Sequence, residues 1–113
     1  MIQDNDELWN GPDGHTYILA YPSVGVIKIG QAVYYAERLE QVRNMSPVET
    51  EVVCALVGLH HERELHRRFA PLRQRGEFFT DTPELREYVL SHPDKLSHEE
   101  AVASCRYTKN RRR

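Results

Sequence analysis

The chain has little of what marks secreted, membrane-spanning or cysteine-rich metal proteins. Only two cysteines, Cys54 and Cys105, occur among 113 residues, and they are not spaced as metal ligands, so a disulfide framework is not expected. Cys54 lies in the apolar stretch VVCALV, which predicts a buried, reduced core residue. No stretch reaches the roughly 20 apolar residues of a membrane span. The acidic start MIQDNDELWN is unlike a signal peptide. These absences predict a cytoplasmic protein with no membrane partner.

The chain also lacks a large net charge, which by itself argues against nucleic-acid binding. The formal net charge is −2, but the charges are segregated along the sequence. Residues 1–14 are acidic, residues 63–75 carry five arginines against Glu64 alone, and the C-terminal RYTKNRRR has five basic residues and no acidic one. Segregation of this kind is what a polyanion-binding face requires. A solvated helix face followed by a disordered tail accounts for the same pattern.

Three segments have the composition of strands. HTYILAY is rich in aromatic and β-branched residues, PSVG is a turn, and VIKIG is a second strand, so residues 15–30 predict a β-hairpin. ETEVVCALVG predicts a third strand that is buried in its middle, and EFFT a short extended piece.

Helical segments are expected between and after these strands. Apolar residues at a spacing of three and four predict a helix in AVYYAERLEQVRNM, and HERELHRRFAPL predicts a second one that ends at Pro71. TPELREYVLSH opens with Thr82 as N-cap and Pro83 at the first helical position. SHEEAVASCRY predicts one more helix, capped by Ser97.

The order of these elements predicts an α/β fold. We expect a small single-domain sandwich in which a three-stranded mixed or antiparallel sheet, with the β-hairpin first, is flanked by three or more helices. The expected organisation is a flexible lead-in over residues 1–14, the folded domain over 15–92, and a C-terminal extension with a basic tail over 93–113.

The stretch LHHERELH (59–66) raises the question of a metal site. It begins like the zinc-protease pattern HExxH, but the residue four positions after His61 is Leu65. His66 comes one residue late, which rotates it by about 100° from the ligand position. What remains is Glu62 with His66 on one helical face. His60 and His61 are expected to be polar residues at the start of the helix.

Four residues in a fixed order give the strongest pattern. Tyr17 ends HTY, Lys28 begins KIG, Arg38 follows Gly30 by eight residues, and Glu62 lies on the second expected helix. In this order and spacing the chain resembles the GIY-YIG nuclease superfamily over residues 16–90. The run ELHRRF…RGEFF resembles a compact, phage-associated branch in which KIG is common. The chain departs from the family where HTY keeps only its tyrosine and Lys28 replaces the second tyrosine.

The resemblance implies a metal-dependent endonuclease that hydrolyses phosphodiester bonds in DNA by cutting or nicking. Glu62 would hold Mg²⁺ or Mn²⁺, and Arg38 would contact the scissile phosphate. Tyr17 would orient or deprotonate water, and Lys28 would share that task if its neighbours depress its pKa. Gly30 would be structural and allow the strand to turn tightly toward the helix.

Two residues have open roles. His66 would hydrogen-bond a metal-bound water or a phosphate, or be an ordinary surface histidine. Gln74 stands twelve residues after Glu62, where relatives commonly have an asparagine. The predicted DNA contacts are arginines: Arg63, Arg67, Arg68, Arg73, Arg75, Arg111, Arg112 and Arg113.

Two other functions fit the same sequence. A nucleic-acid-binding module of the same fold that is catalytically weak or inactive is supported by the replacement of the second tyrosine by Lys28. A partner-binding protein with no nucleic-acid role is disfavoured by the arginines of residues 63–75.

Overall fold

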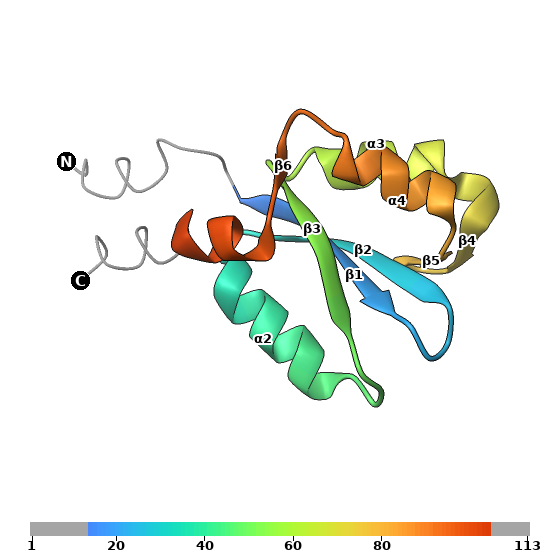
Figure 1. Ribbon diagram of the computed structural model, residues 1–113, viewed down its shortest axis with the longest axis horizontal. Coiled ribbons are helices and arrows are strands. Elements are labelled where there is room, and N and C mark those ends of the chain that lie inside the picture. Colours follow the sequence, from blue (N-terminus) through green and yellow to red (C-terminus); the bar gives the residue numbers. More distant parts are fainter. Residues whose placement is uncertain (1–13, 105–113) are drawn as a thin grey trace.

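The computed structural model describes residues 14–104, which fold around one antiparallel sheet of six strands (Figure 1). The strand order is β4-β5-β2-β1-β3-β6. The three long strands lie at the centre of the sheet: β1 (His15–Tyr21), β2 (Val26–Ala32) and β3 (Glu51–Val57). The short ones complete its two sides: β4 (Arg73–Arg75), β5 (Phe78–Thr80) and β6 (Lys95–Leu96).

The expected three-stranded sheet is therefore wrong, although the hairpin comes first as predicted and every pairing is antiparallel. The additional strands have only two or three residues. In β4 all three residues are exposed and polar, so the segment shows neither the alternation nor the apolar content that marks a strand. β5 and β6 form because the edges of β2 and β3 offer unpaired backbone groups, and β4 pairs in turn with β5. This is a tertiary cause that local sequence does not encode.

The predicted helices are present: α2 (Tyr35–Met45), α3 (His61–Arg68), α4 (Pro83–Leu90) and residues 98–104. The expected second helix is shorter, because the segment continues past Phe69 as a 3₁₀ turn, Ala70–Leu72, with Pro71 inside it. The Thr82 hydroxyl accepts a hydrogen bond from the Leu85 N–H at 3.1 Å, which confirms that cap. Ser97 and Glu100 bond each other's backbone N–H groups, which is a capping box.

Successive residues of the central strands face opposite sides of the sheet, and each side has its own core. Ile18 and Ala20 belong to the core beneath α3 and α4. Tyr17 and Leu19 belong to the core beneath α2 and residues 98–104, which lie together on the other side (Figure 1). Cys54 is buried, as expected.

Residues 93–104, assigned to an extension from sequence, are joined to the domain. β6 pairs with β3, and Ala101 is fully buried against the sheet. The predicted lead-in and basic tail lie outside the described residues, apart from Gly14. Among the helices of residues 14–104, none is both long and apolar enough to cross a membrane.

Candidate active site

Tyr17 and Gly30 face each other across the β1–β2 pair and form the centre of the site. Tyr17 is fully buried. A Cβ atom on Gly30 would lie 2.5 Å from the Tyr17 hydroxyl and 2.9 Å from a carboxylate oxygen of Glu77. Gly30 has an ordinary strand conformation, so the expected tight turn is not its role. The missing side chain leaves the space in which these two polar groups approach each other.

Glu77 is the site residue that sequence analysis missed. Its carboxylate pairs with the Lys28 ammonium at 2.5 Å, and its carbonyl accepts a hydrogen bond from the Ile29 N–H at 2.8 Å. Gly76 just before it has φ +55°, so a tight turn directs Glu77 back toward β2. The signal that could have found it is the RGEFF run that carries part of the family resemblance, in which Glu77 stands between a turn glycine and two phenylalanines.

The cationic groups gather at the Tyr17 hydroxyl, which makes no hydrogen bond of good geometry within residues 14–104. Burial raises the pKa of Tyr17, while the neighbouring charges of Lys28 and Arg38 act to lower it. The Lys28 ammonium lies 5.9 Å from the centre of the Tyr17 ring. β1, β2 and α2 therefore bring three of the predicted site residues together.

Lys28 does not have the depressed pKa that a role as base requires. Burial acts to lower its pKa, but the hydrogen bond to Glu77 and the proximity of Tyr17 outweigh burial and raise it. Its ammonium group therefore stays charged at neutral pH. Lys28 is equipped to stabilise negative charge and not to accept a proton.

Glu62 reaches this group from the opposite side of the sheet. It lies on α3. β5 pairs with β2 over Val26–Lys28 and the Ile29 N–H bonds the Glu77 carbonyl, so no described strand pairs with this edge of β2 beyond Ile29. Burial and the nearby Glu77 carboxylate raise the pKa of Glu62, whereas His66 and Lys28 act to lower it. A surface cavity of ≈ 360 Å³ lies at this edge, lined by Gln31, Leu59, His60, Glu62 and Arg63. Glu62 thus adjoins Glu77 and Lys28 at the open edge of the strand.

His66, one turn after Glu62, also faces β2. Its Nε2 lies 3.0 Å from the carbonyl oxygen of Ile29, which can only accept, so Nε2 carries the proton. The ring packs against Phe79 with centroids 4.9 Å apart. The basic lone pair of neutral His66 is therefore on Nδ1.

Other predicted residues lie away from this group. The Gln74 side chain donates to the Thr80 hydroxyl at 2.7 Å on the β4–β5 hairpin, and Arg73 donates to the Gly76 carbonyl at 2.8 Å. Arg68 stacks on the Tyr88 ring at 4.1 Å. Arg67 and Arg75 are exposed, and of the predicted DNA contacts within residues 14–104 only Arg63 lines the Glu62 cavity. Arg111, Arg112 and Arg113 lie outside the described residues.

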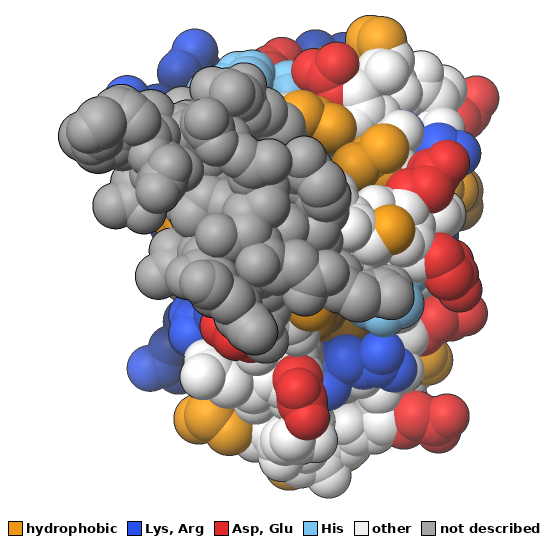
Figure 2. Space-filling model, turned by 90° about the vertical axis from the view of Figure 1, so that its left-hand side faces the viewer, with side chains coloured by type: hydrophobic (Ala, Val, Ile, Leu, Met, Phe, Trp, Pro, Cys, Tyr) orange, Lys and Arg blue, Asp and Glu red, His pale blue; other side chains and the backbone are white. Residues whose placement is uncertain are grey.

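The charges of the described surface remain partly segregated. On the face shown in Figure 2, acidic side chains gather along the right-hand side, while basic side chains stand mainly to the left and below. A polyanion such as DNA is attracted to the basic side of such a surface and repelled by the acidic side.

The carboxylates of Glu62 and Glu77 offer the ligand chemistry of a hard divalent cation. Burial raises the pKa of Glu62, and the nearby Glu77 carboxylate adds to this rise, as expected where two negative charges lie close together. A Mg²⁺ or Mn²⁺ ion prefers oxygen ligands and would relieve the repulsion between them. The residues present therefore fit the predicted metal.

Comparison with known proteins gives one match. No curated protein and no solved structure matches the chain significantly. A family model described as the T5orf172 domain matches residues 14–105, which include every described strand and helix. The resemblance to GIY-YIG nucleases stays a prediction. By this match over most of its length, the chain belongs to the T5orf172 domain family.

Proposed function

We propose that the protein is a metal-dependent endonuclease of GIY-YIG type that hydrolyses phosphodiester bonds in DNA and acts in the cytoplasm. One observation carries the proposal. Two strands, β1 and β2, and two helices, α2 and α3, join the β4–β5 turn in bringing five side chains to the edge of β2: Tyr17, Lys28, Arg38, Glu62 and Glu77. Hydrolysis of a phosphodiester requires cations that face developing negative charge, and this group supplies them beside two carboxylates.

Arg38 and Lys28 would bind the scissile phosphate. The Arg38 guanidinium is always charged and fits two phosphate oxygens at once. Lys28 keeps its proton through its pairing with Glu77, so it stabilises the charge that accumulates on the phosphate. The Tyr17 hydroxyl also keeps its proton at neutral pH, since burial raises its pKa, and it is available to donate a hydrogen bond.

A Mg²⁺ or Mn²⁺ ion held by Glu62, with Glu77 beside it, would supply positive charge to the transition state and the leaving oxygen. The attacking water must lose a proton as its oxygen bonds phosphorus and the opposite P–O bond breaks. Nδ1 is the basic nitrogen of neutral His66, because Nε2 donates to Ile29, and His66 is near enough to Glu62 to act on its pKa. His66 is therefore our candidate for the base that receives this proton, in place of Lys28.

A non-catalytic DNA-binding module is the second candidate. The observation that favours it is that Tyr17 and Lys28 both have raised pKa values, so neither is suited to accept a proton at neutral pH. Such a module would keep the phosphate contacts of Arg38 and Lys28. It would bind DNA without breaking it, with or without a divalent metal.

Nicking of supercoiled plasmid with Mg²⁺ or Mn²⁺ tests the proposal. The wild type should nick only with metal, and Glu62→Gln should lower the single-turnover rate at least about a hundredfold, the loss expected when a principal stabiliser of the transition state is removed. DNA binding should persist in this variant. Glu87→Gln, an equal change on the exposed surface of α4, is the control and should cleave normally.

Each alternative outcome has a definite meaning. DNA binding by the wild type with no metal-dependent nicking would establish the binding module instead. Equal cleavage by Glu62→Gln and the wild type would show that Glu62 is an ordinary helix residue, and the mechanism would be wrong.

A further inference from the structure

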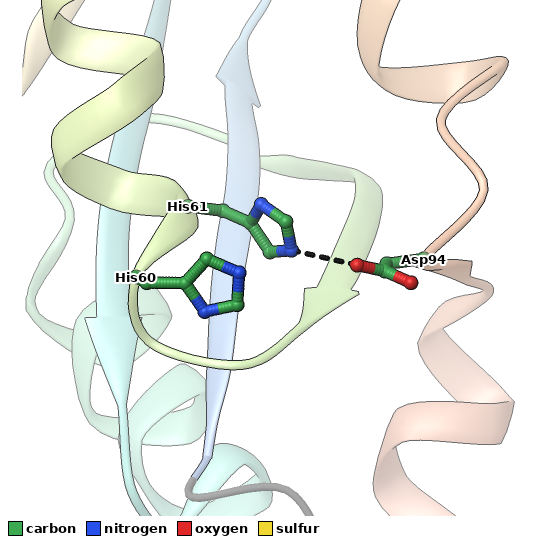
Figure 3. Close-up of side chains that lie close together, drawn as sticks. All are labelled: His60, His61 and Asp94. Atoms are coloured by element: carbon green, nitrogen blue, oxygen red, sulfur yellow. Dashed lines mark hydrogen bonds and ion pairs between the residues drawn. The ribbon is translucent and has the colours of Figure 1, made fainter.

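A second polar cluster lies where α3 begins. His60 ends the β3–α3 loop, His61 begins α3, and Asp94 comes from the turn before β6 (Figure 3). Each residue offers one ligand atom, and these atoms lie within 4.8 Å of one another. His61 Nε2 is 2.9 Å from Asp94 Oδ2. Sequence analysis expected both histidines to be polar residues at a helix start, because Asp94 is distant in the chain.

His61 is the buried member and has an unsatisfied nitrogen. It is 5% exposed, and within residues 14–104 its Nδ1 has no hydrogen-bond partner. The Glu64 carboxylate is the nearest charged group, 3.7 Å away. In neutral His61, Nε2–H donates to Asp94, which leaves the lone pair of Nδ1 facing the Glu64 carboxylate. Leaving a buried acceptor without a donor is unfavourable by about 1–3 kcal/mol.

A metal ion bound to Nε2 of His61 would remove the unfavourable contact between the Nδ1 lone pair and the Glu64 carboxylate. The ring proton would then sit on Nδ1 and face Glu64. Histidines that bind metals commonly donate their other N–H to a carboxylate in this way, which fixes the ring and its tautomer. Glu64 and Asp94 would thus have different roles, one as support for the ring and the other as a ligand.

The backbone holds the cluster in place. The Val57 N–H donates to the Asp94 carbonyl at 3.0 Å, and the Asp94 N–H donates to His92 Nδ1 at 3.0 Å. Gly58 has φ +104°, and a Cβ there would lie 2.8 Å from the His60 ring. A glycine is therefore needed both for the loop conformation and to leave space for the His60 ring.

From this geometry we infer that His60, His61 and Asp94 bind a late first-row divalent cation, in the first instance Zn²⁺, which ties the β3–α3 loop to the turn before β6. Two imidazoles and one carboxylate suit Zn²⁺ and not Mg²⁺. A tetrahedral zinc site needs its ligand atoms roughly 3.4 Å apart. The His60 side chain is exposed and, within residues 14–104, packs against the His61 ring and Gly58, so rotation of its side chain can close this distance. Three protein ligands leave the fourth position for water.

Calorimetric titration of the untagged full-length protein with Zn²⁺ tests the site, with Co²⁺ as a spectroscopic probe. Excess Mg²⁺ occupies hard oxygen sites, and a Cys105→Ser background removes the one thiol outside the described residues. One Zn²⁺ should bind per chain, raise the Tm, and give the visible absorption of four-coordinate Co²⁺. His60→Ala and Asp94→Asn should each raise the Kd at least about tenfold.

The control variant is His98→Gln, which removes an imidazole from the opposite side of the sheet, where His98 contacts Tyr35. It should bind Zn²⁺ with unchanged affinity. His60→Ala is the primary variant because an exposed side chain is replaced, and an unchanged far-ultraviolet circular dichroism spectrum verifies its fold.

Three results would overturn the inference. The absence of saturable binding would make His61 a bridge between two carboxylates with no metal. Unchanged affinity in both His60→Ala and Asp94→Asn would make any bound zinc adventitious. Loss of zinc in Glu62→Gln, with His60→Ala unaffected, would move the ion to the candidate active site. None of these measurements involves DNA, so they stand apart from the test of nuclease activity.

Discussion

Two clusters of polar side chains meet at the start of α3 and differ in chemistry. The strand-edge cluster comprises Tyr17, Lys28, Arg38, Glu62 and Glu77, and the histidine cluster comprises His60, His61 and Asp94. The first combines carboxylates with fixed cations. The second combines two imidazoles with one carboxylate and includes no lysine or arginine.

Adjacent residues of α3 supply both clusters. His61 is directed toward Asp94, and Glu62 toward Glu77 and Lys28. One residue corresponds to a rotation of about 100° around the helix, so neighbouring side chains face different surroundings. Neighbouring residues of LHHERELH can therefore contribute to the two proposed metal sites, one of carboxylates and one mainly of imidazoles, without a shared ligand.

Gly30→Ala is expected to have the largest effect, because it should disturb the strand-edge cluster and leave the histidine cluster intact. Its Cβ would lie 2.5 Å from the Tyr17 hydroxyl and 2.9 Å from Glu77, so both groups must move. A displacement of about 1 Å at a reacting centre lowers rates by roughly a hundredfold, and overpacking destabilises by about 1–3 kcal/mol. We expect losses of this size in single-turnover cleavage and in urea unfolding, with Zn²⁺ affinity unchanged.

Gly25→Ala is the matched control for that substitution. Gly25 has φ +69° in the β1–β2 turn, and a Cβ there meets no atom within 4 Å. Strain in the left-handed region costs about 1–2 kcal/mol, so its stability should fall to a similar extent while cleavage stays near normal. Equal cleavage by the two variants would mean that the space at Gly30 has no functional role.

A smaller effect is expected from Glu77→Gln, which sharpens the assignment of Glu77 to the strand-edge cluster. Loss of its charge frees Lys28 from a 2.5 Å pairing and should lower cleavage by about tenfold, as for groups that orient a site residue. Lys28→Met and the double variant complete a double-mutant cycle. The two single losses should be non-additive by about 0.5–3 kcal/mol in activation free energy. If the two losses in activation free energy were additive, Glu77 and Lys28 would act independently in cleavage.

Features with local causes were the ones that sequence predicted. The β1–β2 hairpin follows from two strand-like runs around a turn, and Thr82 caps α4 because its hydroxyl needs only the N–H three residues later. The order of Tyr17, Lys28, Arg38 and Glu62 also gave a candidate site. The structure brings Tyr17 together with Lys28 and Arg38, and Glu62 together with Lys28.

Features created by tertiary contact were not predictable. Glu77 is separated from Lys28 by 49 residues, and Asp94 from His61 by 33, so no local spacing connects them. The histidines of LHHERELH were compared only with other residues of one helix, where the pattern of a zinc site fails. Asp94, the third proposed ligand, lies in the turn before β6, and the short strands β4 and β6 likewise depend on edges that exist only after folding.

The smallest expected effect is a change in the salt dependence of DNA binding when a single arginine is removed. It tests whether DNA lies beside the strand-edge cluster. Arg63 lines the cavity at Glu62, whereas Arg68 stacks on Tyr88 of α4, 4.1 Å from its ring. If DNA lies along the edge of β2, Arg63→Ala removes one phosphate contact and should reduce the salt dependence of binding by about one unit of logarithmic slope. Arg68→Ala should leave that slope unchanged and lower the stability by about 0.5–1 kcal/mol through the lost stacking. Fluorescence anisotropy over a salt series measures the slope, and Zn²⁺ affinity should be the same in both variants. A larger change of slope in Arg68→Ala would place the DNA on the α4 side, away from the strand-edge cluster.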